Sequence, residues 1–169
     1  MKKLFIIGFL SLCGAAAVAQ QAEVTMEGST KIIKGFISKK DLVTDSSFTW
    51  FAENQKGYVP EQHALQAFRA NKDSINILAF GGTWCGDTKN ILPKFFVLAD
   101  AAGLSPDRIT LLGVDRNKKT IQHLTDAFNV TRVPTFIVLK NGVEIGRVVE
   151  YGKTGQFDKE LGEILTTTH

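Results

Sequence analysis

Short, nearly continuous runs of apolar residues along the chain predict buried strands. The run at 74–82 ends in two glycines, and the run at 107–115 follows the same pattern, which is typical of strands covered on both faces of a sheet. A third run at 31–37 predicts a first strand. Residues 133–152 predict a β-hairpin, because an Asn-Gly pair at 141–142 favours a tight turn between two apolar segments.

Stripes of apolar residues at helical spacing separate these runs. They predict helices over 44–57, 60–73, 87–103, 117–130 and 154–167. Strands that alternate with helices, followed by a hairpin and a closing helix, predict an α/β fold in which helices flank a central mixed β-sheet.

Residues at the helix ends refine this prediction. Asp45 is a candidate N-cap for the 44–57 helix, Ala52 falls on its apolar face, and Gly57 is a candidate stop. Pro60 is expected at the first position of the next helix, where a missing N–H costs nothing.

The first residues have the form of a secretory signal peptide. Two lysines precede an apolar run from residue 4 to about residue 12, and small residues at 17–19 offer a cleavage site before Gln20. The run is too short to span a membrane. Cys13 raises a lipoprotein alternative, which the preceding Leu12 disfavours. We therefore expect an exported, periplasmic or secreted protein.

Three parts of the chain follow from this pattern. Residues 1–19 form the signal peptide, and residues 20–59 form an N-terminal extension that begins with a loose leader up to about residue 29. Residues 60–169 form the main domain. Removal of the signal peptide would leave Cys85 as the single cysteine of the mature chain, a candidate reactive thiol.

Composition removes several classes of function. The formal net charge is +3, and two of the positive charges lie in the signal peptide, so nothing indicates a nucleic-acid partner. Cys85 and three scattered histidines, His63, His123 and His169, have no metal-ligand spacing. The chain has no glycine-rich phosphate loop, and we expect no cofactor.

Cys85 follows a predicted strand and begins a predicted helix, in the stretch GGTWCGDTKN. The positive end of the helix dipole favours an anion, and the thiolate is the nucleophilic form of cysteine. We expect the Thr88 hydroxyl, one helical turn along, to donate a hydrogen bond to the sulfur. Asp87 is expected to face solvent in the first turn, and Trp84 either packs in the core or lines a groove.

Four segments resemble thioredoxin in order and spacing: WCGDTKNILP, GVDRN, VPTFIVLKNG and the late Gly152. The resemblance covers roughly residues 60–166 and implies a thioredoxin fold. It implies that Cys85 is the attacking cysteine and that a cis bond joins Val133 to Pro134 beside the sulfur. It further implies a client-binding groove beside Cys85 and Pro134. Val133 and four other residues would line this groove: Trp84, Gly86, Asp87 and Gly152.

The departures from the family pattern decide the expected chemistry. Thr88 stands where the resolving cysteine would be, and apolar Ala79 and Leu111 replace the buried acid and its lysine neighbour. We therefore expect Cys85 to form mixed disulfides with cysteine-containing protein clients. An external thiol must then release them.

Two alternatives remain. The chain could be a redox-inactive binding or chaperone module that holds an extended peptide in the groove beside Pro134. It could also carry out peroxide chemistry at Cys85. Peroxiredoxins resemble this fold, but they place a threonine three residues before the cysteine, where Gly82 stands here.

Overall fold

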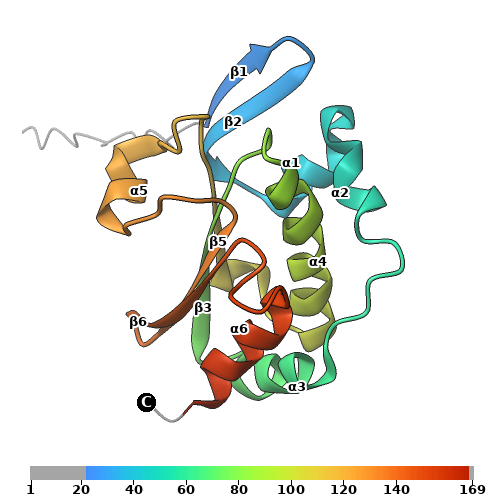
Figure 1. Cartoon of the computed structure of the whole chain (residues 1–169), viewed down its shortest axis with the longest axis vertical. Coiled ribbons are helices and arrows are strands. Elements are labelled where there is room, and N and C mark those ends of the chain that lie inside the picture. Colours follow the sequence, from blue (N-terminus) through green and yellow to red (C-terminus); the bar gives the residue numbers. More distant parts are fainter. Residues whose placement is uncertain (1–21, 168–169) are drawn as a thin grey trace, which may run out of the picture.

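A mixed β-sheet organises residues 22–167, the part of the chain that the computed structural model describes (Figure 1). Within this range the sheet has six strands in the order β1-β2-β4-β3-β5-β6. Its strands are β1 Glu23–Glu27, β2 Thr30–Ile37, β3 Ile75–Gly81, β4 Ile109–Gly113, β5 Thr135–Lys140 and β6 Val143–Val149. β3 and β4 are parallel and the other neighbouring pairs are antiparallel, so the predicted mixed sheet is confirmed.

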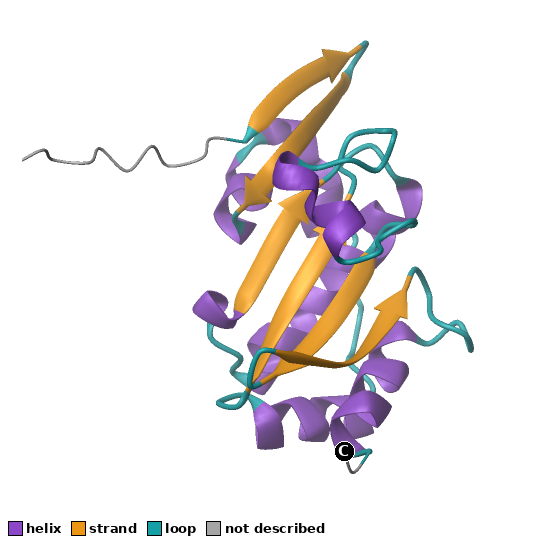
Figure 2. Cartoon of the chain, turned by 90° about the vertical axis from the view of Figure 1, so that its left-hand side faces the viewer, coloured by secondary structure: helices purple, strands orange, loops and turns teal. Residues whose placement is uncertain are grey.

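Helices cover both faces of this sheet unequally. The longest helix, α4, packs with α1, α2, α3 and α6 on one face, and α5 lies on the other (Figure 1, Figure 2). The helices are α1 Lys39–Thr44, α2 Thr49–Glu53, α3 Gln62–Asn71, α4 Gly86–Ala102, α5 Leu124–Ala127 and α6 Phe157–Thr166, with 3₁₀ turns at Ser46–Phe48, Pro106–Arg108 and Ile121–His123. The predicted flanking of a central sheet by helices is therefore confirmed.

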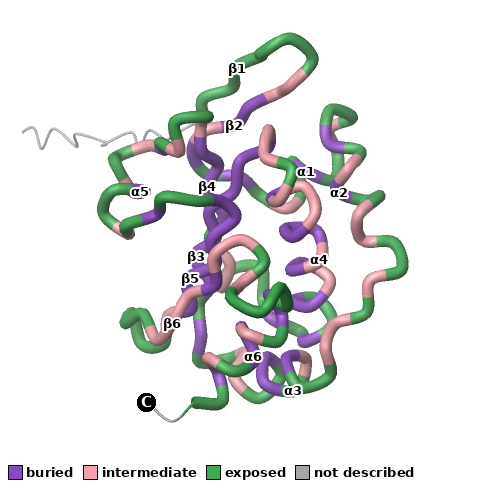
Figure 3. Tube along the Cα trace, viewed as in Figure 1, coloured by how far each residue is buried: buried purple, intermediate pink, exposed green. Residues whose placement is uncertain are grey.

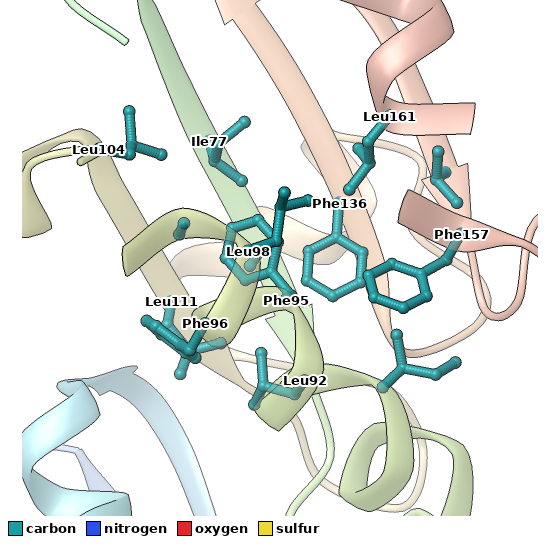
Figure 4. Packing of buried hydrophobic residues seen from close by; sticks show 14 of the residues in the cluster. Ile77, Leu92, Phe95, Phe96, Leu98, Leu104, Leu111, Phe136, Phe157 and Leu161 are labelled. Atoms are coloured by element: carbon teal, nitrogen blue, oxygen red, sulfur yellow. The ribbon is translucent and has the colours of Figure 1, made fainter. Parts of the chain in front are cut away.

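The main core lies between the sheet and α4, where purple segments gather in Figure 3. Phe95 of α4 contacts Phe136 of β5, with 4.6 Å between their ring centroids, and Phe157 of α6 lies next to Phe136 (Figure 4). Phe95 and Phe136 are fully buried. These aromatic contacts hold α4, and with it the residues at its start, firmly against the sheet.

The N-terminal extension is more ordered than the sequence indicated. The expected loose leader is wrong: Glu23–Glu27 form β1, which pairs with β2 in a hairpin that projects beyond the other strands of the sheet (Figure 2). All five residues of β1 are exposed, so the strand carries no core-facing pattern to detect. α1 was also not predicted, although Ser38 and Asp41 form a capping box at its start.

The predicted helix over 44–57 is broken into two shorter pieces. Asp45 does cap a helix, but it is the 3₁₀ turn at Ser46–Phe48, where its carboxylate accepts the Ser47 N–H. α2 follows and ends at Glu53, four residues before Gly57, and Ala52 is exposed. Thr49 continues directly from the 3₁₀ turn, without a side-chain cap of its own for α2.

Two further helix starts differ from expectation. α3 begins at Gln62 rather than at Pro60, because the carboxylate of Glu61, its N-cap, accepts the N–H groups of His63 and Ala64. The predicted helix over 117–130 is reduced to a 3₁₀ turn and the single turn of α5. The buried Thr120 donates its hydroxyl to the Gly113 carbonyl, which ties the chain to β4 and delays the helix.

The predicted α4, hairpin turn and closing helix are confirmed. Gly103, with φ of 73°, ends α4 in the left-handed conformation, and Pro93 lies inside the helix. Asn141 and Gly142 both have positive φ in the turn between β5 and β6.

β2 joins the sheet through a very close approach to β4. Gly35 to Ile37 pair with Leu111 to Gly113 in antiparallel register. A Cβ atom on Gly113 would lie 2.2 Å from the Ile33 carbonyl oxygen, so only glycine fits at this position. The contact sets the hairpin directly against the end of β4.

A buried carboxylate joins the extension to the last helix. Asp158 of α6 accepts hydrogen bonds from the Tyr58 hydroxyl at 2.6 Å and from the Glu61 N–H at 3.0 Å. Burial, and then the hydrogen bond to Asp158, raise the pKa of the Tyr58 phenol well above its ordinary value.

Tyr58→Phe is therefore expected to change how stability depends on alkaline pH. Above about pH 10 the unfolded chain loses the Tyr58 proton while the folded chain keeps it, so the free energy of unfolding falls as pH rises. Urea unfolding of both proteins between pH 8 and 11 measures this, and the wild-type protein should show the steeper alkaline fall. Equal slopes would contradict the assignment.

Candidate functional site

Cys85 lies where β3 leads into α4. Cys85 is the N-cap of this 17-residue helix. The Cys85 carbonyl accepts the Lys89 N–H at 3.0 Å, and the Cys85 N–H donates to the Gly82 carbonyl. The sulfur is thus placed at the helix end where unpaired N–H groups and the helix dipole favour negative charge. The sequence prediction of a helix start at this cysteine is confirmed.

The sulfur of Cys85 faces the residues before β5. Its thiol donates a hydrogen bond to the Val133 carbonyl over 3.3 Å, and the side chain is half-buried. The Val133–Pro134 peptide bond is cis, as the resemblance implied. The Pro134 carbonyl accepts the Glu150 N–H at 2.7 Å, which ties this turn to the end of β6. The fold therefore brings Cys85 and Pro134 together from segments about 50 residues apart.

Thr88 does not bond to the sulfur. Its side chain is 1% exposed, and its hydroxyl oxygen accepts the Gly82 N–H at 3.2 Å. Its methyl group packs so closely on Gly81 that a Cβ there would lie 2.9 Å away. The predicted hydroxyl–sulfur hydrogen bond is wrong: within residues 22–167 the Cys85 sulfur bonds to the Val133 carbonyl, and Thr88 bonds to Gly82. The buried amide of Gly82 needs an acceptor, and the Thr88 oxygen supplies it.

Trp84 lies beside the cysteine and is half-buried. Its indole Nε1–H donates to the Val114 carbonyl at 3.0 Å, and its ring lies over Gly82, where a Cβ would be only 2.8 Å from it. It packs with Cys85 against the smaller apolar cluster, which includes Val133. The structure therefore supports the core-packing interpretation of Trp84, and its role in lining a groove stays a prediction.

The other predicted groove residues occupy different environments. Gly86 is exposed, and Asp87 is half-buried in the first turn of α4. Gly152 has φ of 81°, and a Cβ on it would meet the Glu160 carboxylate at about 2.6 Å. Gly152 thus makes room for Glu160 of α6.

Four residues whose contacts surround Trp84 and Pro134 were not predicted. The Thr83 hydroxyl donates to the Lys31 carbonyl at 2.8 Å and accepts the Ile33 N–H at 3.3 Å. The Arg116 guanidinium lies 5.4 Å from the Trp84 ring centroid. Arg132 and Glu150 form an ion pair at 3.1 Å beside Pro134.

The sequence offered little to identify them. Thr83 directly precedes the motif WCGDTKNILP and Arg116 lies within GVDRN, but neither motif indicates a partner for the side chain. The partners of Thr83, Lys31 and Ile33, lie in the N-terminal extension, which carries no recognisable motif.

Two features of residues 22–167 bear on other functions. No three His, Cys, Asp or Glu side chains in this range are grouped so that they could hold a metal ion. In the same range, no helix combines the length and apolar character needed to cross a membrane.

Comparison with known proteins gives a consistent result. The family model described as Thioredoxin matches residues 59–163. The thioredoxin of Echinococcus granulosus is 34% identical over 83 residues, which cover 49% of this chain and 72% of the relative. The thioredoxin of Alicyclobacillus acidocaldarius is 28% identical over 106 residues, or 62% and 90% of the two chains. The solved thioredoxin NaTrxh from Nicotiana alata aligns at 26% identity over 64% of this chain and 89% of its own, with a TM-score of 0.40.

Proposed function

This chain belongs to the thioredoxin family, and on that premise we propose that it carries out thiol–disulfide exchange through Cys85 alone. One observation carries the proposal: the Cys85 sulfur lies at the start of α4, 3.3 Å from the Val133 carbonyl and beside Pro134, while a buried threonine stands at position 88. A nucleophile is present, and the side chain that would resolve its product holds no sulfur.

The proposed first step is attack by the Cys85 thiolate on a client disulfide. A bond forms between Sγ of Cys85 and one client sulfur, and the client's S–S bond breaks. The second client sulfur leaves as a thiolate and takes a proton from water. Cys85 is oxidised in the mixed disulfide, and the departing sulfur is reduced. The Thr88 hydroxyl cannot take part, because it cannot form a disulfide.

The proposed second step needs an external thiol. Its thiolate attacks the mixed disulfide, forms a new disulfide with the client sulfur and returns Cys85 to the reduced state. The proposed partners are therefore a cysteine-containing or extended protein client and an outside reductant. Cys13, the other cysteine of the sequence, lies outside the described residues.

Thr88→Cys tests the missing step. A cysteine at position 88 would restore the Cys-x-x-Cys spacing at the start of a helix, which redox-active disulfides use. After reduction, wild-type protein lacking Cys13 should stop at the mixed disulfide unless a small thiol is present. Thr88→Cys should release the client without it. Thr88→Ser is the control, because serine matches cysteine in shape but has no sulfur. Equal release by wild type and Thr88→Cys without a thiol would contradict the monothiol mechanism.

A binding module is the second candidate. The Cys85 thiol is half-buried and already donates to the Val133 carbonyl, so the sulfur could serve packing alone. In that case Cys85→Ser should bind an extended client peptide as tightly as wild type, with no covalent adduct in either protein. A covalent adduct in the wild-type protein would exclude this candidate.

Export is a further part of the proposal. It rests on the signal-peptide pattern of residues 1–19, which lie outside the described range. Mass spectrometry of the protein from its native source should find a chain beginning at Gln20, and a chain that retains residues 1–19 would contradict export.

A further inference from the structure

The Trp84 ring is held from three directions. Val114 accepts its N–H at 3.0 Å, and Gly82 lies against one part of the ring with no side chain between them. The Arg116 guanidinium lies over the ring at 5.4 Å from the centroid, a cation–π contact. All three contacts come from the thioredoxin-like part of the chain.

Arg116 is in turn held by the N-terminal hairpin. Its Nε is ion-paired with the Glu27 carboxylate at the end of β1, and both side chains are about half exposed, at 50% and 49%. Without a partner, an arginine side chain in this loop would adopt many rotamers, and only some of them would cover the ring. The ion pair favours the conformation in which the guanidinium covers Trp84, by the modest amount that an exposed pair contributes.

The same hairpin also holds the residue before Trp84. The Thr83 hydroxyl bridges the Lys31 carbonyl and the Ile33 N–H of β2, and Thr83 is 4% exposed. Both residues that precede Cys85 are thus fixed by the hairpin, one through a buried hydroxyl and the other through Arg116.

We propose that Arg116 is a positioning residue for Cys85, and that the β1–β2 hairpin supports the reactive site by holding Arg116 and Thr83 in place. Glu27 holds Arg116 over the Trp84 ring, and the fixed ring presents a rigid wall beside the sulfur. The effect of Arg116 on the reaction rate of Cys85 rests on the proposed thiol–disulfide exchange. The fixing of the Trp84 ring by Arg116 does not depend on that proposal. A preformed wall lowers the cost of docking a client, because fewer side chains must be ordered when it binds.

A fluorescence measurement tests the fixing of Trp84 directly. The sequence has two tryptophans, so Trp50→Phe leaves Trp84 as the reporter. In that background, Arg116→Gln and Glu27→Gln should both raise the acrylamide quenching constant of Trp84. Arg116→Lys, which keeps a cation, should recover part of the protection. This readout needs no reaction at the sulfur, so it decides the fixing of Trp84 even if Cys85 proves unreactive.

A matched control exists on the other side of the molecule. Lys39 also bridges a carboxylate and a ring, because it pairs with Asp100 and lies 5.6 Å from the Phe96 ring centroid. Lys39→Gln and Asp100→Asn remove the same kinds of contact away from Cys85. They should leave Trp84 quenching at the level of the Trp50→Phe parent. If all four variants change quenching equally, the effect is general loosening and the proposal fails.

The rate of mixed-disulfide formation separates positioning from charge. Neutral 2,2′-dipyridyl disulfide and the anionic reagent DTNB both react with an accessible thiolate. Arg116→Gln should slow both about two- to fivefold, the range that an exposed cation–π contact supports. Slowing with DTNB alone would mean that Arg116 only attracts anions, which overturns the positioning role. Unchanged quenching and unchanged rates with both reagents would also overturn it.

Discussion

Cys85→Ser is expected to abolish mixed-disulfide formation completely. Serine keeps the position at the start of α4 and can donate the same hydrogen bond to the Val133 carbonyl, so the fold should be retained. Oxygen cannot replace sulfur in the exchange, however, because the product is an S–S bond. Incubation of reduced protein with 2,2′-dipyridyl disulfide, followed by mass measurement, should give one adduct for wild type and none for Cys85→Ser.

Two controls make this result specific. Both proteins should be made without residues 1–19, so that Cys13 cannot react in place of Cys85. Urea unfolding should place the two stabilities within about 1 kcal/mol, as expected for the exchange of one small polar side chain in a half-buried site. Exchange activity that survives in Cys85→Ser would place the chemistry elsewhere and remove the proposed function.

Gly113→Ala is expected to cause the largest loss of stability among the changes considered. The added methyl group would lie 2.2 Å from the Ile33 carbonyl oxygen, which is backbone and cannot move away by a change of rotamer. Overpacking usually costs about 1–3 kcal/mol, and a clash with backbone inside a sheet should reach or exceed the upper end of that range. Urea unfolding of wild type and Gly113→Ala measures the difference.

The site of damage should also be local. Because the clash separates β2 from β4, limited proteolysis of Gly113→Ala should begin within residues 22–37. Gly86→Ala is the matched control, since a Cβ at this exposed position meets nothing within 4 Å. Its free energy of unfolding should stay within about 0.5 kcal/mol of wild type, as is usual for surface changes. A Gly113→Ala protein as stable as Gly86→Ala would show that β2 can shift without cost.

Strands and helices that bury a broad apolar face could be predicted from the sequence. β3, β4 and α4 all have continuous or helically spaced apolar residues, and their positions were close to those observed. β1 could not be predicted because all five residues are exposed, so its strand conformation depends on pairing with β2. The split of the predicted 44–57 and 117–130 helices depends on local hydrogen bonds, such as that of Thr120, which periodicity does not report.

The reactive site was predictable in its residues and less so in its contacts. Cys85 and Pro134 belong to recognisable motifs, and the fold brings them together. Spacing alone could not show that the buried Gly82 N–H would use the Thr88 oxygen as its acceptor. Arg116 and Glu27 are 89 positions apart, so their ion pair could not be inferred from spacing.

The position of β2 beside β4 has a consequence for the order of folding. Gly35 pairs with Gly113, and Ile37 with Leu111, so this ladder closes loops of more than 70 residues, whereas β3 and β4 are joined across about half that distance. Because the entropy cost of closure rises with loop length, contacts between such distant residues tend to form slowly. The hairpin that fixes Thr83 and Trp84 should therefore dock after the central strands have assembled. During refolding, Trp84 should therefore reach its native fluorescence later than Trp50. The Cys85 thiol would reach its native environment only after the rest of the chain has folded.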